Sequence, residues 1–201
     1  MSRARVIVVK VGGSLLASAK LPRRLRAWLA AEATAQPDSH FVLLAGGGKW
    51  VDAIRAIDSR TPLGDEQAHW ICIALMDVTA GLLGALLPEL CAVATWEELE
   101  RRLRAPGLTL LLPKHFLEQR ESSLPGTRLP ANWSVTSDAI AGRLAVVLAA
   151  SDLVLLKSAP PPLPDPMDQL AGWAAAGYVD AFLSALAEEL PSLRCIALNG
   201  A

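Results

Sequence analysis

The sequence has few cysteines, three in 201 residues. Cys72, Cys91 and Cys195 lie far apart and form no Cys-x-x-Cys pair, which argues against a disulfide framework and a cysteine-based zinc site. We interpret them as small buried hydrophobic residues in a protein of a reducing compartment.

An excess of charge of either sign is also missing. The chain has 19 Lys and Arg against 20 Asp and Glu, a formal net charge of −1. This balance disfavours nucleic-acid binding through bulk charge, although a few placed cations could still hold a small acidic ligand. With 52% hydrophobic residues, the composition also excludes disorder as the main state of the chain.

Long uncharged apolar runs are absent as well, because no stretch of about 20 such residues has the character of a membrane span. The apolar stretch after Arg3 and Arg5 is interrupted by Lys10 and the Gly12-Gly13 pair, and is too short for a secretory signal. We therefore expect a cytoplasmic protein with no membrane partner. The length predicts one domain over residues 1–201.

Apolar, often β-branched runs alternate with helical patterns along the whole chain. Strands are expected at 5–11, 41–45, 91–95, 108–112, 153–156 and 194–198, and helices at 22–35, 49–58, 65–87, 97–104, 136–150 and within 167–190. Residues 113–132 and the prolines of 160–166 are expected to form loops. Alternation of this kind predicts a three-layer αβα sandwich with a mainly parallel central sheet. Ligands of such folds bind at the carboxyl ends of the strands, where the motifs below fall.

Two glycine-rich loops follow the first two expected strands, Lys10-Val11-Gly12-Gly13-Ser14 and Gly46-Gly47-Gly48-Lys49. A lysine at the end of a buried strand needs a partner, and glycines let backbone N–H groups approach an anion closely. A glycine loop at a helix N-terminus adds the favourable helix dipole. Neither the Walker A spacing nor the dinucleotide fingerprint is present, since Val51 stands at the third glycine position of the latter. Two such loops side by side predict a polyphosphate site, whereas a single one could be a tight turn whose lysine reaches solvent.

Two further motifs also lie at expected strand or helix ends. Val135-Thr136-Ser137-Asp138 precedes a helix, and either caps it or supplies a carboxylate that orients lysines near phosphates. Lys157, followed by Ser158, ends the apolar strand 153–156 and repeats the arrangement of Lys10.

Taken in order, these motifs resemble the amino acid kinase family: Lys-x-Gly-Gly-Ser, Gly-Gly-Gly, and then Ser-Asp-x-x-Ala before the next-to-last strand. The resemblance implies that the protein binds ATP and Mg²⁺ and transfers the γ-phosphoryl group to a carboxylate, phosphate or carbamate oxygen. It implies that Lys10 contacts the transferred phosphoryl group and that Asp138 organises the catalytic lysines. Nucleotide contacts are expected from Gly12, Gly13, Ser14, Gly46, Gly47, Gly48, Ser137 and Ser158. No protein ligand to the metal is assigned.

The chain also departs from the family pattern. Lys157-Ser158 stands where members usually have Ser/Thr-Asp, Asp180 stands where many have a second lysine, and the C-terminal nucleotide-binding part is short. These departures, with His69-Trp70 and the Leu129-Pro130-x-x-Trp133 sequence, resemble a subgroup, the short kinases of methanofuran-type cofactor synthesis. The subgroup implies phosphorylation of aminomethyl-furan-methyl phosphate to its diphosphate, with Lys157 replacing the second lysine, and the family implies a homo-oligomer. Acceptor contacts are then expected from Gly47, Gly48, His69, Trp133, Thr136 and Asp180.

Other functions remain open at this point. The protein could be a non-catalytic nucleotide- or anion-binding subunit on the same fold. It could also phosphorylate another acceptor, such as an amino acid carboxylate, isopentenyl phosphate or a nucleoside monophosphate. An unrelated dinucleotide-binding protein is disfavoured by the failed glycine fingerprint.

Overall fold

The computed structural model describes residues 4–162 and 170–198, and its element order alternates between strands and helices as the sequence predicts. The strands are β1 (Arg5–Val11), β2 (Ser39–Ala45), β3 (Cys91–Val93), β4 (Gly107–Leu111), β5 (Asp152–Lys157) and β6 (Ser192–Ala197). The α-helices are α1 (Leu21–Ala35), α2 (Gly48–Asp58), α3 (Asp65–Leu86), α4 (Trp96–Arg102), α5 (Pro113–Gln119), α6 (Ser137–Val147) and α7 (Leu170–Ala175). Three short 3-10 helices are η1 (Gly13–Ala17), η2 (Glu121–Ser123) and η3 (Ala181–Leu186). Part of the expected proline-rich loop 160–166 and the start of the expected helical region at 167 lie outside the described residues.

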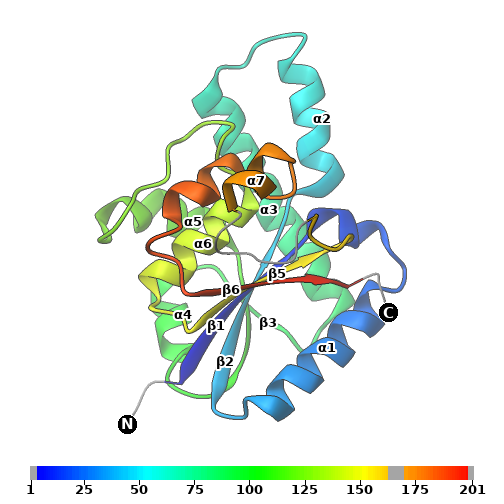
Figure 1. Ribbon diagram of the computed structural model, residues 1–201, viewed down its shortest axis with the longest axis vertical. Coiled ribbons are helices and arrows are strands. Elements are labelled where there is room, and N and C mark those ends of the chain that lie inside the picture. Colours follow the sequence, from blue (N-terminus) through cyan, green and yellow to red (C-terminus); the bar gives the residue numbers. More distant parts are fainter. Residues whose placement is uncertain (1–3, 163–169, 199–201) are drawn as a thin grey trace.

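All strand pairs of the six-stranded sheet are parallel, in the order β3-β4-β2-β1-β5-β6 (Figure 1). The predicted α/β sandwich is therefore confirmed. Strand β1 lies between β2 and β5, with Val11 in register with Ala45 on one side and Leu156 on the other. The carboxyl ends of these three strands consequently meet at the centre of the sheet, where parallel folds place their ligands.

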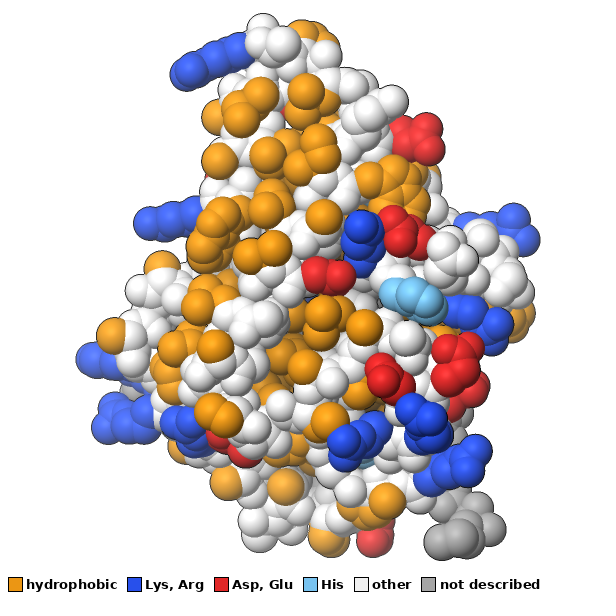
Figure 2. Space-filling model, turned by 180° about the vertical axis from the view of Figure 1, so that it is seen from behind, with side chains coloured by type: hydrophobic (Ala, Val, Ile, Leu, Met, Phe, Trp, Pro, Cys, Tyr) orange, Lys and Arg blue, Asp and Glu red, His pale blue; other side chains and the backbone are white. Residues whose placement is uncertain are grey.

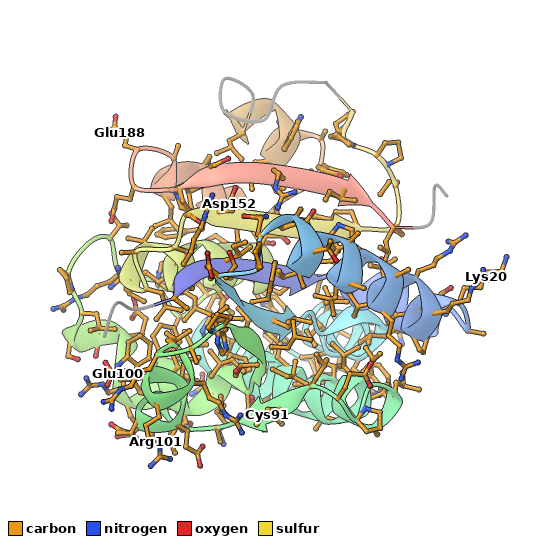
Figure 3. All side chains as sticks on the ribbon, turned by 90° about the horizontal axis from the view of Figure 1, so that it is seen from below. Lys20, Cys91, Glu100, Arg101, Asp152 and Glu188 are labelled. Carbon is orange, nitrogen blue, oxygen red and sulfur yellow. The ribbon has the colours of Figure 1, made fainter. Side chains whose placement is uncertain are left out.

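Two apolar layers sandwich the sheet, because successive side chains of a strand point to opposite faces. Val6 and Val8 of β1 belong to the apolar layer that includes residues of α4, α5, α6 and α7, whereas Ile7 and Val9 belong to the layer that includes residues of α1. Helix α3 contributes to both layers. In Figure 3, which views the molecule from below, the strands succeed one another from β6 toward β3 with helices on either side. Burial on both faces explains why the strands read as continuous apolar runs.

The segment 113–132 differs from the sequence-based expectation of a loop, because it contains α5 and η2. Pro113 occupies the start of α5, where the missing N–H group costs nothing. Phe116 is buried and stacks on Trp96 with ring centroids 5.4 Å apart. A proline that reads as a helix breaker in the sequence therefore starts a helix.

A buried arginine holds the rest of this segment against α6. Arg143 is fully buried, and its Nε donates to Glu121 Oε1 at 2.8 Å. Its Nη1 and Nη2 donate to the carbonyl oxygens of Pro125 and Leu124 at 2.6 and 3.0 Å. The guanidinium thus fixes the chain that leads to Trp133 and the N-terminus of α6.

Helix α3 is the one helix among the described residues that is long and apolar enough to cross a membrane by length and composition alone. The core helix of a soluble protein passes the same test, and α3 buries Ile73, Met76 and Leu83 in the two apolar layers. Its other side exposes Ile71, Val78, Leu82 and Leu86. Figure 2 shows hydrophobic side chains gathered over the upper part of the face behind that of Figure 1, where α2 and α3 lie.

Candidate active site

The two glycine loops lie in direct contact at the ends of β1 and β2. A Cβ at Gly13 would lie 2.2 Å from the Gly48 nitrogen, and a Cβ at Gly48 would lie 2.6 Å from the Gly13 oxygen. Gly48 also has φ of +56°, in the left-handed region that glycine tolerates. Backbone-to-backbone packing of this kind requires both glycines, and it brings the two predicted loops together.

Not every glycine N–H group in these loops faces the ligand side. Gly12 N donates to the Leu156 carbonyl at 2.8 Å and Gly46 N donates to the Val11 carbonyl at 2.9 Å, so both extend the sheet. Helix α2 begins at Gly48, and the first N–H groups of a helix have no partner within it. The N–H groups that these loops could offer to an anion are therefore those at the start of α2.

Beneath the loops, one carboxylate bridges two ammonium groups. Asp138 Oδ1 lies 2.9 Å from Lys10 Nζ, and Asp138 Oδ2 lies 2.6 Å from Lys157 Nζ. Lys10 and Asp138 are 5% and 3% exposed. Lys157 Nζ also donates to the Tyr178 carbonyl at 2.7 Å and lies 5.1 Å from the centroid of its ring. Lys10, on a buried strand, therefore has Asp138 as its counter-charge. Lys157 shares the same carboxylate.

Burial and charge act in opposite directions on this cluster. Burial alone would raise the pKa of Asp138, but the Lys10 and Lys157 ammonium groups outweigh it and hold that pKa below its usual range. Burial and the neighbouring Lys10 lower the pKa of Lys157, although Asp138 opposes the shift. Within the cluster itself two cations face one carboxylate, and the nearby Asp180 carboxylate also acts on Lys157.

Asp180, from which an acceptor contact is expected, is not among the residues that line the cavity described below, and its carboxylate lies at the N-terminus of α6. Its Oδ2 accepts hydrogen bonds from Thr136 N at 3.0 Å and Ala139 N at 2.8 Å, and its Oδ1 accepts one from the Thr136 hydroxyl. Burial and the nearby Asp138 raise the pKa of Asp180. The N-terminus of α6 is therefore capped by a carboxylate from the start of η3 and not by the side chain of Thr136 or Ser137.

A cavity of about 420 Å³ opens above the lysines and the glycine loops. Its wall includes most of the predicted site residues: Lys10, Gly12, Gly13, Ser14, Gly47, Gly48, His69, Trp133, Thr136, Ser137, Lys157 and Ser158. Gly46 and Asp138 lie behind this wall; a Cβ at Gly46 would lie 3.2 Å from Lys10 Cε. Ser14 Oγ donates to Ser158 Oγ at 3.1 Å and so joins the loop after β1 to the end of β5.

The end of the cavity away from the lysines is formed by α2, α3 and the segment before α6. Trp133 Nε1 donates to Asp58 Oδ2 at 2.9 Å, and the Arg55 guanidinium lies 5.2 Å from the Trp133 ring centroid. Arg55 Nη1 also lies 3.2 Å from Asp52 Oδ1. His69 is buried and hydrogen-bonded to the Asn132 backbone, and burial lowers its pKa. This end thus combines an aromatic ring, a cation, carboxylates and an imidazole with a lowered pKa.

Comparison with known proteins finds similarity over the part of the chain that forms this site. The model of the amino acid kinase family matches residues 5–161, most of the chain. The chain belongs to the amino acid kinase family. One relative, the [5-(aminomethyl)furan-3-yl]methyl phosphate kinase of Methanocaldococcus jannaschii, is 23% identical over 152 residues. That alignment covers 74% of this chain but 63% of the relative, so the chain matches less than two thirds of that protein.

Solved structures show the same fold at low sequence identity. The uridylate kinase of Archaeoglobus fulgidus superposes with a TM-score of 0.62 and 17% identity, covering 94% of this chain and 89% of its own. The N-acetylglutamate synthase of Neisseria gonorrhoeae superposes with a TM-score of 0.63 and 16% identity, covering 98% and 55%. The fold of the amino acid kinase family is therefore shared with a protein named as a synthase.

Several cavity residues of this family member escape sequence reasoning. Asp52, Arg55, Cys72, Asn132 and Tyr178 line the wall as well. A signal exists for two of them, since Asp52 and Arg55 follow Gly48 at helical spacing and so share its side of α2. The backbone carbonyl of Tyr178 accepts a hydrogen bond from Lys157, and a backbone contact of this kind cannot be predicted from residue types.

Proposed function

We propose that the protein is an ATP-dependent kinase that transfers the γ-phosphoryl group to the phosphate of a small anionic acceptor. As the acceptor we propose aminomethyl-furan-methyl phosphate, which would become the diphosphate. The observation that carries this proposal is the Lys10–Asp138–Lys157 cluster beneath two contacting glycine loops at the mouth of a cavity. Membership of the amino acid kinase family and the methanogen relative support it.

The residues have separate parts in this reaction. Lys10 contacts the transferred phosphoryl group, Lys157 contacts the β-phosphate of the leaving ADP, and the N–H groups at the start of α2 bind the phosphate oxygens. Asp138 holds the Lys157 ammonium group through a charge-assisted hydrogen bond and the Lys10 ammonium group through an ion pair. A phosphate acceptor is already an anionic nucleophile near neutral pH, so the reaction needs no general base. Catalysis then consists of in-line positioning and stabilisation of the charge on the moving group.

Magnesium enters this proposal as part of the MgATP substrate. The carboxylates nearest the lysines are engaged, Asp138 with two ammonium groups and Asp180 with the N-terminus of α6. Within the described part of the chain, no group of three or more His, Cys, Asp or Glu side chains could hold a metal ion. In this proposal the phosphate oxygens of ATP would supply ligands for the ion.

Because we assign Lys157 to the β-phosphate, we propose that the nucleotide base binds at the end of the cavity near β5. Ser158, Ala159, Gly177 and Tyr178 line this end and adjoin Lys157, the proposed contact of the β-phosphate. This placement agrees with the proposal of a single domain whose nucleotide-binding part is shortened. The acceptor then occupies the opposite end, between α2 and Trp133.

The test is Lys10→Ala in a coupled assay of ADP release, with a panel of phosphorylated acceptors. Loss of one well-placed electrostatic donor costs on the order of 10²–10³ in rate, and Lys10 contacts the reacting group itself. Lys20→Ala is the matched control, since Lys20 is exposed at the outer edge of the molecule (Figure 3). Turnover close to that of the wild type in Lys10→Ala would refute the proposal.

A second candidate is a nucleotide- or anion-binding subunit without phosphotransfer. The structural likeness to a protein named as a synthase supports this candidate, since the fold is not confined to kinases. Binding of ATP by calorimetry without ADP release from any acceptor in the panel would select it.

We further propose a cytoplasmic homo-oligomer that packs through α3. Its exposed Ile71, Val78, Leu82 and Leu86 form an apolar strip along one side of the helix, which a second subunit could cover. Light scattering should give a mass of at least two chains, and Val78→Glu should reduce it.

A further inference from the structure

The two ends of the cavity differ in the charged side chains that line them. Near the glycine loops, two ammonium groups face one carboxylate in the Lys10–Asp138–Lys157 cluster. At the remote end, the Asp52 carboxylate and the Arg55 guanidinium line the wall as an ion pair, while Asp58 is outside the lining and accepts from Trp133 Nε1. A ligand that spans the cavity can therefore place a negative group beside the lysines and a cationic group beside Asp52, in exchange for the Arg55 guanidinium.

Resting on the proposed kinase function, we propose that the acceptor is a zwitterion whose cationic group binds Asp52 beside the Trp133 ring, so that Asp52 determines acceptor specificity. The phosphate of such an acceptor faces the glycine loops and receives the phosphoryl group. Its organic ammonium occupies the remote end of the cavity.

The remote end already holds a cation. The Arg55 guanidinium lies 5.2 Å from the centroid of Trp133 and 3.2 Å from Asp52 Oδ1. An aromatic face and a carboxylate are the two partners that an alkylammonium group uses in proteins. The side chain of Arg55 therefore marks where the ammonium of the acceptor binds.

Displacing Arg55 costs little. The side chains of Arg55 and Asp52 are 49% and 69% exposed, and an ion pair between such exposed residues contributes little to stability. Arg55 lies in the last turn of α2, so its long side chain can move into solvent without disturbing the helix. An incoming ammonium group can thus exchange with it.

The ring of Trp133, by contrast, is fixed. Asp58 Oδ2 accepts from its Nε1 at 2.9 Å, while Asp58 Oδ1 accepts from Leu63 N at 2.7 Å. Asp58 thereby ties the segment before α6 to the connection between α2 and α3. A fixed indole beside the cavity offers a flat wall for an acceptor with a planar ring.

The experiment is a cycle of two changes, one in the protein and one in the acceptor. Asp52→Asn removes the carboxylate charge with little change of shape, and an acceptor analogue carries a methyl group in place of the aminomethyl group. We expect Asp52→Asn to raise KM for the amine-bearing acceptor roughly five- to tenfold, as for a cation bound by a partly exposed carboxylate and an aromatic ring. KM for the methyl analogue and KM for ATP should stay within twofold of the wild type.

Two control variants distinguish the possible outcomes. Glu100→Gln removes the same charge from an exposed position at the outer edge of the molecule (Figure 3) and should leave both acceptors unaffected. Arg55→Ala should leave KM for the amine-bearing acceptor unchanged or lower it, because the internal cation no longer competes. A rise of fivefold or more in Arg55→Ala would instead show that the remote end binds an anion, and would overturn the proposal, as would equal effects of Asp52→Asn on both acceptors.

Calorimetric binding of the two acceptors to protein saturated with a non-hydrolysable ATP analogue separates this inference from the proposed function. If the wild type releases no ADP with any acceptor, the kinase proposal fails. The difference in affinity between the two acceptors, and its loss in Asp52→Asn, still decides the role of Asp52. Absence of that difference in the wild type refutes it.

Discussion

Replacing Asp138 by asparagine should destabilise the protein in a way that depends on pH. The carboxylate is buried and is the shared partner of Lys10 at 2.9 Å and Lys157 at 2.6 Å. Asparagine keeps the shape but leaves two buried ammonium groups without a counter-charge. Breaking a buried ion pair by removing one partner costs about 3–5 kcal/mol.

Urea unfolding followed by tryptophan fluorescence measures this loss. For a chain of this size the dependence on urea is about 2–3 kcal/mol per M, so the midpoint should fall by about 1–2 M at pH 7. The loss should shrink as the pH rises. Asp138 opposes the lowering of the pKa of Lys157, so its removal lowers that pKa further. Between the folded-state pKa and the unfolded value of about 10.4, the unfolded chain binds more protons, and stability therefore rises with pH.

The acid side gives an independent check. The pKa of Asp138 lies below its ordinary value, so its contribution is present above the unfolded pKa and is lost as the pH falls through the folded one. The variant should lack that acid dependence. Asp38→Asn, the same change at an exposed position, should cost less than about 0.5 kcal/mol. A loss below about 1 kcal/mol at pH 7, or one that does not vary with pH, would refute this account of the cluster.

Two other variants test the parts around the cluster. Gly13→Ala places a Cβ 2.2 Å from the Gly48 nitrogen, so the glycine loops must separate. Calorimetry should then show loss of ATP binding, while the circular dichroism spectrum stays native. An unchanged affinity for ATP would contradict the role of the loops. Asp180→Asn removes a carboxylate that accepts from two N–H groups and a hydroxyl at the start of α6, which should cost about 2 kcal/mol in urea unfolding and lower kcat with little effect on acceptor KM. A selective rise in acceptor KM would instead mean that Asp180 contacts the acceptor.

The sheet and the phosphate end of the cavity could be predicted because their signals are local. Runs such as Val6–Val9 are apolar on every residue and mostly β-branched, which is typical of a strand buried on both faces. The glycines mark backbone contacts that a Cβ would block, and Lys10 marks a buried charge that needs a partner. Each of these requirements can be stated from neighbouring residues alone.

The rest depends on contacts between distant segments. Asp180 caps a helix through donors 41 and 44 residues away, so no local pattern separates this role from substrate binding. Arg55 and Asp52 read as a solvated helix face until the segment of Trp133 is placed beside them. Helix α5 is not predicted from the sequence because a proline breaks a helix in its interior but is favoured at its first position. Pro113 occupies that first position.

The three residues from Tyr178 to Asp180 touch the reactive cluster from two directions. The carbonyl of Tyr178 restrains one ammonium group, while the carboxylate of Asp180 holds the helix end that carries Asp138. A displacement of residues 178–180 would therefore affect both members of one ion pair, Lys157 and Asp138. Because Tyr178 also borders the cavity, this stretch links the cavity wall to both charges of the pair.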